Sequence, residues 1–346
     1  MAFQLRTLLA LLLVMSPLAA IAAPRRHAVA PPVPCFSAIL AEAATGTVVL
    51  DNGFVYYGDW ASRGVYRVAK TGGSPQLLAI FPCCVVTQMV VDADHVYVAM
   101  RRHGDAIQAP NDQWLYNIVA IGKSGGAVVT LAEGVWLPQQ LAVDDHSVYW
   151  ASLGTVINDP KFASDGKIER VEKDGTGRTT LASGLSGPTT VAVDDSFVYF
   201  GESGLAQGNT SKGVRGVPKN GGTVQRLYDN PVDFMALNGD DLYLLYENYS
   251  ANKTSITQVA KDGGQVKRSF TDVLVIGNTM TINDGRIYYY SKTKASAAVA
   301  SVTLDLLGRT VHVERLLNGE QIGVDSCALY ISTIAPTDFE VERVMK

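Results

Sequence analysis

Long apolar segments are scarce in this sequence of 346 residues, which narrows the class of protein. The clearest apolar run is N-terminal, from Leu8 to Val14. No other segment offers the ~20 apolar residues of a membrane-spanning helix. The sequence also has no long cluster of basic residues. Its 29 Lys and Arg residues are interspersed with 33 Asp and Glu residues, and the net charge is -4. The sequence therefore argues against a nucleic-acid partner and against a membrane span in the mature protein.

Histidine is rare as well, and the sequence contains no recognisable catalytic motif. Each of the five histidines falls in the N-terminal segment, a predicted turn or loop, or an outer strand: His27, His95, His103, His146 and His312. There is no phosphate-binding loop and no zinc-ligand spacing. We therefore rank a binding or interaction module ahead of an enzyme, with an unidentified ligand.

The N-terminus has the pattern of a secretory signal peptide. Arg6 precedes the apolar run, and Ala20-Ile21-Ala22 resembles a cleavage site. Ser16 and Pro17 interrupt the run, which favours a cleaved signal over a spanning helix. We predict a signal peptide over 1–22, a Pro-rich linker over 23–34 and a folded domain over 35–346. The protein is then exported to the periplasm or the extracellular space.

One short unit recurs along the folded part. The stretches LAVDDHSVYW (141–150) and VAVDDSFVYF (191–200) are nearly identical, and five relatives begin at residues 48, 89, 235, 280 and 322. The seven copies are spaced at intervals of roughly 40 to 50 residues, which is typical of solenoids and propellers. The copies lack a helical apolar period and are rich in β-branched and aromatic residues, which excludes an α-solenoid.

A second signature follows most copies and completes the unit. GKIERVEKDG (166–175) and SITQVAKDGG (255–264) combine a strand with Asp-Gly, a pair typical of tight hairpin turns. A short apolar stretch such as TTLAS (179–183) then supplies a last strand. Four strands per repeat predict an all-β fold, a seven-bladed β-propeller of four-stranded antiparallel blades.

The two ends of the folded part fit one blade. FEVERVMK (339–346) matches a third strand and FSAILAE (36–42) matches a fourth, so the N-terminal strand should close the last blade. The least regular copies are the last two. Within the units, Ile168 and Val171 should both be buried, since neighbouring blades cover both faces of a blade. The repeated aspartates are interpreted as turn residues and not as metal ligands.

These units resemble the secreted bacterial propeller repeats related to the YWTD propellers of lipoprotein receptors and to NHL-repeat and TolB-like propellers. The resemblance rests on the AVDDxxVYW and GxIxRVxKDGG patterns and covers nearly all of 36–346. It implies the architecture and no single activity, because the relatives include binding domains, scaffolds, lactonases and lyases. Seven copies differ from the six blades usual in YWTD domains.

The candidate site lies where the first strand of each blade begins. The position five residues before the turn Asp or Asn is occupied, in six of the units, by Thr87, Gln139, Thr189, Asp233, Asn278 and Glu320. Asp233, Asn278 and Glu320 come from adjacent blades and offer oxygen ligands suited to Ca²⁺ or another divalent cation. Propeller lactonases that resemble this architecture use a comparable set. A hydrated polar ring without metal is the alternative interpretation.

The long loops between second and third strands face the same side, and His103 lies in one of them. We expect a protein, peptide or carbohydrate ligand on this side, bound by Asp233, Asn278, Glu320, Gln139 and His103. Two alternatives remain: a metal-dependent lactonase-like or lyase-like enzyme, and a purely structural scaffold. A monomer is expected.

Four cysteines in an exported chain can form disulfides. Cys35 precedes the closing strand, and Cys327 lies in the first turn of the same blade. We favour a bond between Cys35 and Cys327. Cys83 and Cys84 then remain as a strained adjacent pair or as free thiols.

Overall fold

A computed structural model describes residues 38–42, 47–103, 115–158, 161–204, 206, 211–248, 250–251, 253–273, 279–292, 297–316, 319–334 and 339–346. All of them belong to one compact unit, Val33–Lys346. The predicted boundaries at residues 22 and 34 lie outside the described residues and stay predictions. No helix in the described part is long and apolar enough to cross a membrane.

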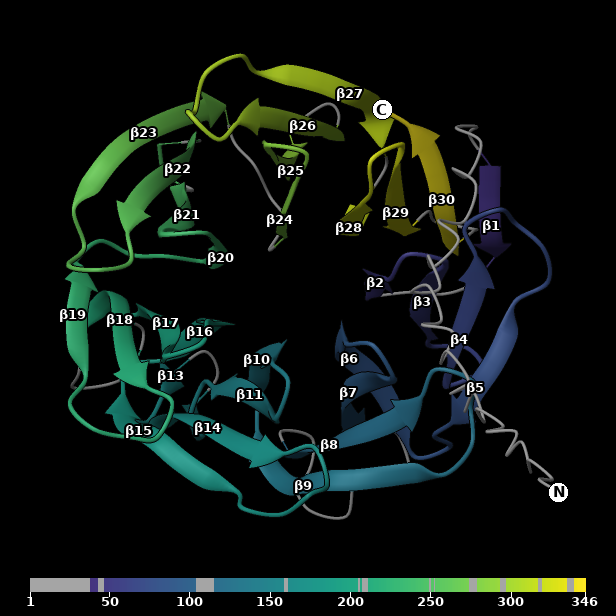
Figure 1. The fold of residues 1–346 in the computed structure, drawn as a ribbon, viewed down its shortest axis with the longest axis horizontal. Helices are drawn as coiled ribbons and strands as arrows, with labels where there is room; N and C mark the ends of the chain where they lie inside the picture. Colours follow the sequence, from purple (N-terminus) through teal and green to yellow (C-terminus); the bar gives the residue numbers. More distant parts are fainter. Residues whose placement is uncertain are drawn as a thin grey trace, which may run out of the picture. The chain divides into compact units, whose positions relative to one another are not determined.

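Seven four-stranded antiparallel sheets follow one another around a ring (Figure 1). The first strands, which lie nearest the centre, are β2 (Val48–Leu50), β6 (Cys84–Val91), β10 (Pro138–Val143), β16 (Pro188–Val193), β20 (Phe234–Asn238), β24 (Met280–Asn283) and β28 (Gly319–Val324). The second strands are β3 (Phe54–Asp59), β7 (His95–Arg102), β11 (Ser147–Ser152), β17 (Phe197–Ser203), β21 (Asp241–Asn248), β25 (Arg286–Lys292) and β29 (Ala328–Ile334). This confirms the predicted fold class.

The outer half of each blade completes the pattern. The third strands are β4 (Gly64–Ala69), β8 (Leu115–Gly122), β14 (Gly166–Glu172), β18 (Lys212–Pro218), β22 (Lys253–Ala260), β26 (Ala297–Thr303) and β30 (Phe339–Met345). The outermost strands are β5 (Gln76–Ile80), β9 (Val128–Trp136), β15 (Thr179–Leu185), β19 (Gln225–Tyr228), β23 (Val266–Val273), β27 (Thr310–Leu316) and β1 (Ala38–Glu42). A small hairpin, β12 (Val156–Asn158) with β13 (Lys161–Phe162), is inserted into blade 3.

The seventh blade combines both ends of the unit. β1 pairs antiparallel with β30, with Ala38 opposite Arg343 and Glu42 opposite Glu340. Leu40 and Ala41 of β1 pack in one cluster with Val48 and Tyr57 of blade 1 and Tyr330 of blade 7. Of the pairing predicted between 36–42 and 339–346, the part formed by 38–42 is present and gives the last blade its fourth strand, while residues 36 and 37 lie outside the described part.

The core lies between neighbouring blades rather than within a single layer. Ile168 and Val171 point to opposite faces of β14 and are both fully buried, as predicted. Trp150 and Tyr149, which are consecutive on β11, pack in two different clusters. Each blade thus buries both faces, so apolar residues need not alternate with polar ones along its strands.

The ring has two faces with different connections. Because consecutive strands run antiparallel, the turns joining first to second and third to fourth strands lie on one side. The loops joining second to third strands, and those leading from one blade to the next, lie on the other. We call the first side the clasp face, after the contacts described next, and the second the loop face.

Candidate functional site

The repeated aspartates of the clasp face cap their own turns. Asp51 Oδ1 accepts hydrogen bonds from the Gly53 and Phe54 amides, both at 2.8 Å, and its Oδ2 accepts one from the Tyr56 hydroxyl at 2.7 Å. The same three contacts recur at Asp92, Asp144, Asp194 and Asp325. The interpretation of these residues as turn residues is confirmed.

Each of these aspartates also binds a lysine from a neighbouring blade. We call the Asp, the Tyr five residues later and the Lys of the neighbouring blade a clasp. Five clasps join Asp51 to Lys123, Asp92 to Lys173, Asp144 to Lys219, Asp194 to Lys261 and Asp325 to Lys70. Since the charges are paired between blades, this face uses its carboxylates to hold the ring together.

The pKa of Asp325 illustrates the electrostatics of a clasp. Burial by itself would raise the pKa of this carboxyl. Hydrogen bonds from Lys70, from the Cys327 and Ala328 amides and from Tyr330 outweigh burial and lower the pKa to about 2. Asp325 is therefore ionised at neutral pH and paired with Lys70.

The remaining two junctions depart from the pattern. Between blades 5 and 6, Asn238 and Leu304 take the positions of the acid and the lysine, and the Tyr243 hydroxyl donates to the Leu304 carbonyl at 3.3 Å. Between blades 6 and 7, Lys346 donates to Asn283 Oδ1 at 3.3 Å and pairs with Asp284 at 3.0 Å. The blade 5–6 junction thus lacks the charged pair of the clasp.

The predicted cation site is only partly within the described structure. Asn278 lies outside the described residues, and Glu320 is placed by its backbone in β28 while its side chain lies outside the described part. The convergence of Asp233, Asn278 and Glu320 therefore stays a prediction. Within the described residues, no group of three or more His, Cys, Asp or Glu side chains could hold a metal ion.

Asp233 itself has a distinctive environment. Its Oδ2 accepts a hydrogen bond from the Glu247 amide at 2.7 Å, and Glu247 on β21 is buried. Burial raises the pKa of Asp233 to about 6, and the charge of Glu247 adds to the rise although the amide bond opposes it. Asp233 therefore changes protonation in a range where most carboxyls are already ionised.

This shift predicts a pH-dependent difference between the protein and its Asp233→Asn variant. At pH 4 the folded carboxyl is protonated and the unfolded carboxyl is about half ionised, so the free energies of unfolding of the two proteins should differ only slightly. As pH rises through 6, the folded chain must hold a buried carboxylate. The free energy of unfolding of the wild type should then fall by about 2 to 3 kcal/mol relative to that of the variant. Urea unfolding at pH 4 and pH 7.5 with EDTA measures this.

The matched control for that measurement is Asp145→Asn, which changes an exposed carboxyl in a turn. The difference in free energy of unfolding between Asp145→Asn and the wild type should be the same at both pH values. An Asp233→Asn variant that is less stable than the wild type at pH 7.5 would contradict the assigned environment of Asp233.

The other predicted positions have mainly structural contacts. Thr87 donates to the Ala99 carbonyl at 3.1 Å, and Thr189 donates to the Val232 carbonyl at 3.2 Å. Gln139 Nε2 donates to the Leu137 carbonyl at 3.2 Å. His103 is exposed at the end of β7, and its amide donates to the Cys83 carbonyl at 2.8 Å. Of these, only His103 presents an exposed side chain.

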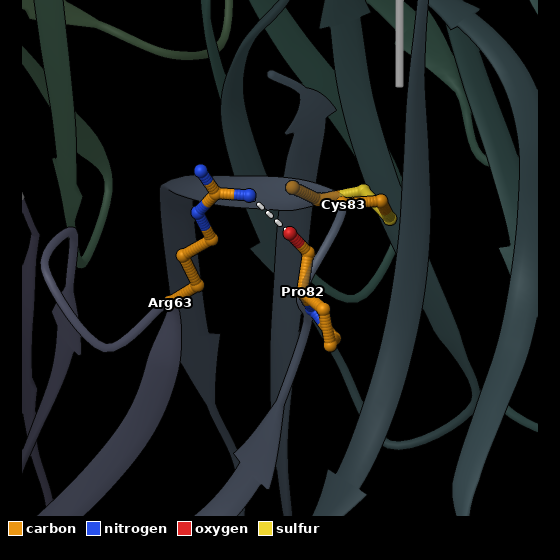
Figure 2. The surroundings of a disulfide bond; sticks show 4 residues. Arg63, Pro82 and Cys83 are labelled. Atoms are coloured by element: carbon orange, nitrogen blue, oxygen red, sulfur yellow. Dashed lines mark hydrogen bonds between the residues drawn. A yellow bond between two sulfur atoms is a disulfide. The ribbon is translucent and has the colours of Figure 1, made fainter. Parts of the chain in front are cut away.

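The Cys83 segment joins three parts of the loop face over blades 1 and 2. Figure 2 shows Arg63, from the β3–β4 loop, directed toward the Pro82 carbonyl beside Cys83, and its guanidinium donates a hydrogen bond to that oxygen. The Phe81 amide donates to the Arg63 carbonyl at 2.8 Å. Trp60 lies in the same loop as Arg63 and is 49% exposed.

The cysteines form the adjacent pair that was one of the two alternatives. Cys83 and Cys84 are linked by a disulfide, with their Cα atoms 3.8 Å apart. Cys327 is also disulfide-bonded. Cys35 lies outside the described residues, so its bond with Cys327 stays a prediction.

A small cavity between blades 2 and 3 was not predicted from the sequence. It has a volume of about 60 Å³ and is lined by Gly134, Trp136, Ser152, Gly154, Thr155, Asp165, Lys167, Glu169 and Arg178. A cavity of this size holds a few water molecules or one small polar group, well below the ~300 Å³ of most ligand pockets.

Glu169 lines that cavity, and both of its carboxylate oxygens are hydrogen-bonded. It accepts hydrogen bonds from Arg178 at 3.0 Å and from Trp150 Nε1 at 3.2 Å. Arg178 also donates to the Glu133 carbonyl of blade 2 at 2.7 Å. The buried Glu169 and the more exposed Arg178 therefore tie two blades together. The sequence does not single out Glu169, because β14 also carries Lys167, Arg170 and Glu172.

Comparison with known proteins supports the architecture. No family model matches the chain. No curated protein matches it. Among solved structures, the streptogramin B lyase structure aligns with a TM-score of 0.58 and 13% identity, covering 90% of this chain and 97% of that one. One chain of a nidogen/laminin complex aligns with a TM-score of 0.52 and 14% identity, covering 76% of this chain and 92% of that one.

A third solved structure, a functionally unknown protein from Desulfotomaculum acetoxidans DSM 771, has a TM-score of 0.53 and 9% identity and covers 77% of this chain and 85% of that chain. At such identities the likeness shows the fold alone. The chain is a seven-bladed β-propeller.

Proposed function

We propose that the protein is a binding module that recognises a protein or peptide ligand on the loop face over blades 1 and 2. The observation that carries this proposal is the exposed Trp60 in the same loop as Arg63, together with the exposed Pro82, Cys83 and His103. Tryptophan and arginine are the side chains most often found at the energetic centre of protein interfaces. The clasp face, by contrast, uses its charges between blades.

The fold is compatible with this role, since one chain of a nidogen/laminin complex shares it. We also propose that the protein is exported, because residues 1–22 have the signal pattern and the chain forms disulfides. N-terminal sequencing of the mature chain, expected to begin after Ala22, checks the export.

Trp60→Ala should weaken ligand binding without affecting the fold. A random peptide library displayed on phage is selected against the wild type, and the enriched peptides are synthesised and titrated. Their affinity for Trp60→Ala should fall at least about tenfold, as expected when an aromatic anchor is truncated. The matched control is Leu307→Ala, which removes an apolar side chain that is 64% exposed in the β26–β27 turn of the clasp face.

Peptides that bind Trp60→Ala as well as the wild type, or that require Leu307, would overturn the proposal. An oligosaccharide array probed with the same three proteins covers the other ligand class. Oligosaccharide binding that depends on Trp60, without peptide binding, would replace the peptide by a carbohydrate.

A metal-dependent enzyme of the lactonase or lyase type is the second candidate. It is favoured by Asp233, which directly precedes the first strand β20 and whose carboxylate contacts the amide of the buried Glu247. The fold shared with streptogramin B lyase is compatible with this candidate. Asn278 and Glu320 would complete the ligand set. If this candidate is right, Ca²⁺ at about 100 times its Kd should stabilise the wild type by about 2.7 kcal/mol and leave Asp233→Asn unchanged. No effect of Ca²⁺ would remove this candidate.

A further inference from the structure

The disulfide between adjacent residues lies in the connection from β5 to β6, on the loop face (Figure 2). Its two Cα atoms are 3.8 Å apart, because one peptide unit joins them. Most protein disulfides span about 4.4 to 6.8 Å between Cα atoms, and departures from this range make the bond easier to reduce. Exposed or strained disulfides are also those that act as labile or regulatory bonds.

The two cysteines differ in access to solvent. Cys83 is exposed, whereas Cys84 is 5% exposed and begins β6 in the blade 2 sheet. An external thiolate can therefore approach Cys83 from solvent, with Cys84 as the leaving sulfur. Cys84 is opposite Arg102 in the β6–β7 pairing and packs in an apolar cluster that includes Phe81 and Val86.

The backbone around the disulfide connects segments that are far apart in sequence. The Cys83 carbonyl accepts a hydrogen bond from the amide of His103, the residue after the end of β7. The Pro82 carbonyl accepts the Arg63 guanidinium, and the Cys84 amide donates to the Phe81 carbonyl at 2.9 Å. Opening the ring would free the peptide between Cys83 and Cys84 to rotate, and the Cys83 carbonyl would lose its fixed direction toward His103.

We propose that Cys83–Cys84 is a redox-active site that undergoes reversible thiol–disulfide exchange with a dithiol. A thiolate of the dithiol attacks Cys83 Sγ, the sulfur–sulfur bond breaks, and Cys84 leaves as a thiolate that takes a proton from water. The second thiol of the reductant then attacks the sulfur of its own chain in the mixed disulfide and releases Cys83. Two electrons and two protons pass to the protein, and the dithiol becomes a cyclic disulfide.

The proposal has a structural consequence that does not depend on the proposed function. Reduction releases the hydrogen bond from the His103 amide to Cys83, so the end of β7 should loosen while the blades stay intact. The clasps are on the opposite face and contain no sulfur, so they are expected to be unaffected.

The first test equilibrates the folded wild-type protein with mixtures of reduced and oxidised dithiothreitol. The thiols are trapped by alkylation and located by peptide mass spectrometry. Cys83 and Cys84 should be half-alkylated at a ratio of reduced to oxidised dithiothreitol at least about tenfold lower than Cys327 requires. Equal ratios for the two sites, or alkylation of Cys83 and Cys84 only in unfolded protein, would overturn the proposal.

The second test follows exchange of the His103 amide by NMR. Exchange should be at least about tenfold faster in the reduced than in the oxidised wild type. In the Cys83→Ser, Cys84→Ser double variant it should be fast and independent of dithiothreitol. The Thr155 amide, held at 2.8 Å by Asp165 on the same face, is the internal control and should not respond. Selective reduction with unchanged His103 exchange would equally overturn the proposal.

Discussion

Lys70→Met is expected to lower the free energy of unfolding by about 3 kcal/mol, because it removes one partner of a largely buried ion pair. The Lys70 side chain is 4% exposed, and its Nζ lies 2.9 Å from Asp325 Oδ2 and 5.2 Å from the centre of the Tyr330 ring. The pair joins blade 1 to blade 7, which are 255 residues apart at this contact. It therefore acts at the junction where the ring closes.

The effect of Lys70→Met should depend on pH with a defined sign. The pKa of Asp325 is lowered to about 2 in the fold, so its contribution is fully present above pH 4 and is lost as pH falls toward 2. The difference between wild type and Lys70→Met, measured by urea unfolding, should therefore shrink below pH 4.

Two further variants distinguish the stabilising effect of the ion pair at ring closure from that of an ordinary surface ion pair. Lys123→Met breaks the equivalent clasp between blades 1 and 2, where the lysine side chain is 14% exposed, and should cost less. Asp229→Asn breaks the exposed pair with Arg226 and should have little measurable effect. If Lys70→Met is no more destabilising than Asp229→Asn, the clasp does not stabilise the closed ring.

The blades could be predicted from the sequence because each one is specified locally. The apolar stretches and the Tyr five residues after a turn Asp or Asn recur at every unit, and Asp-Gly or Asn-Gly turns occur in several units. Each of these signals acts over a short stretch of chain. Even the irregular sixth blade forms, with β26 and β27 as its third and fourth strands. The closing strand could be predicted because an unpaired third strand requires a partner.

The contacts between blades could not be predicted in the same way. Lys70, Lys123, Lys173, Lys219 and Lys261 are visible in the sequence at the end of each third strand, but their acidic partners belong to other blades. The cavity above Glu169 also depends on how two blades meet. The loop-face contact between Arg63 and Pro82 depends on a long-range backbone geometry that no repeat pattern encodes.

Gly264→Ala is expected to be the most destabilising single substitution of a turn residue, by at least about 4 kcal/mol, a loss that points to a severe structural conflict. Gly264 has a φ of +74° in the β22–β23 turn of blade 5. An added Cβ would overlap the Leu227 carbonyl oxygen of β19 in blade 4 and would lie 2.8 Å from the Leu227 Cα. The obstacle is backbone, which cannot move aside as a flexible side chain can.

Gly221→Ala is the matched control, because it isolates the cost of the backbone conformation. Gly221 occupies the corresponding turn of blade 4 with a φ of +82°, and nothing lies within 4 Å of its added Cβ. Its alanine variant should lose only about 1 to 2 kcal/mol, the cost of a left-handed residue with a Cβ.

The difference between the two glycine variants, measured by urea unfolding at pH 7, reports how closely blades 4 and 5 must approach. Leu227 is buried between these blades, so pushing its carbonyl away also separates Leu227 from Val259 in the shared core cluster. A ring of seven blades cannot absorb this displacement at a free end, since β1 and β30 close it. Equal losses for Gly264→Ala and Gly221→Ala would mean that this junction opens at little cost, and that closure does not hold the blades at fixed spacing.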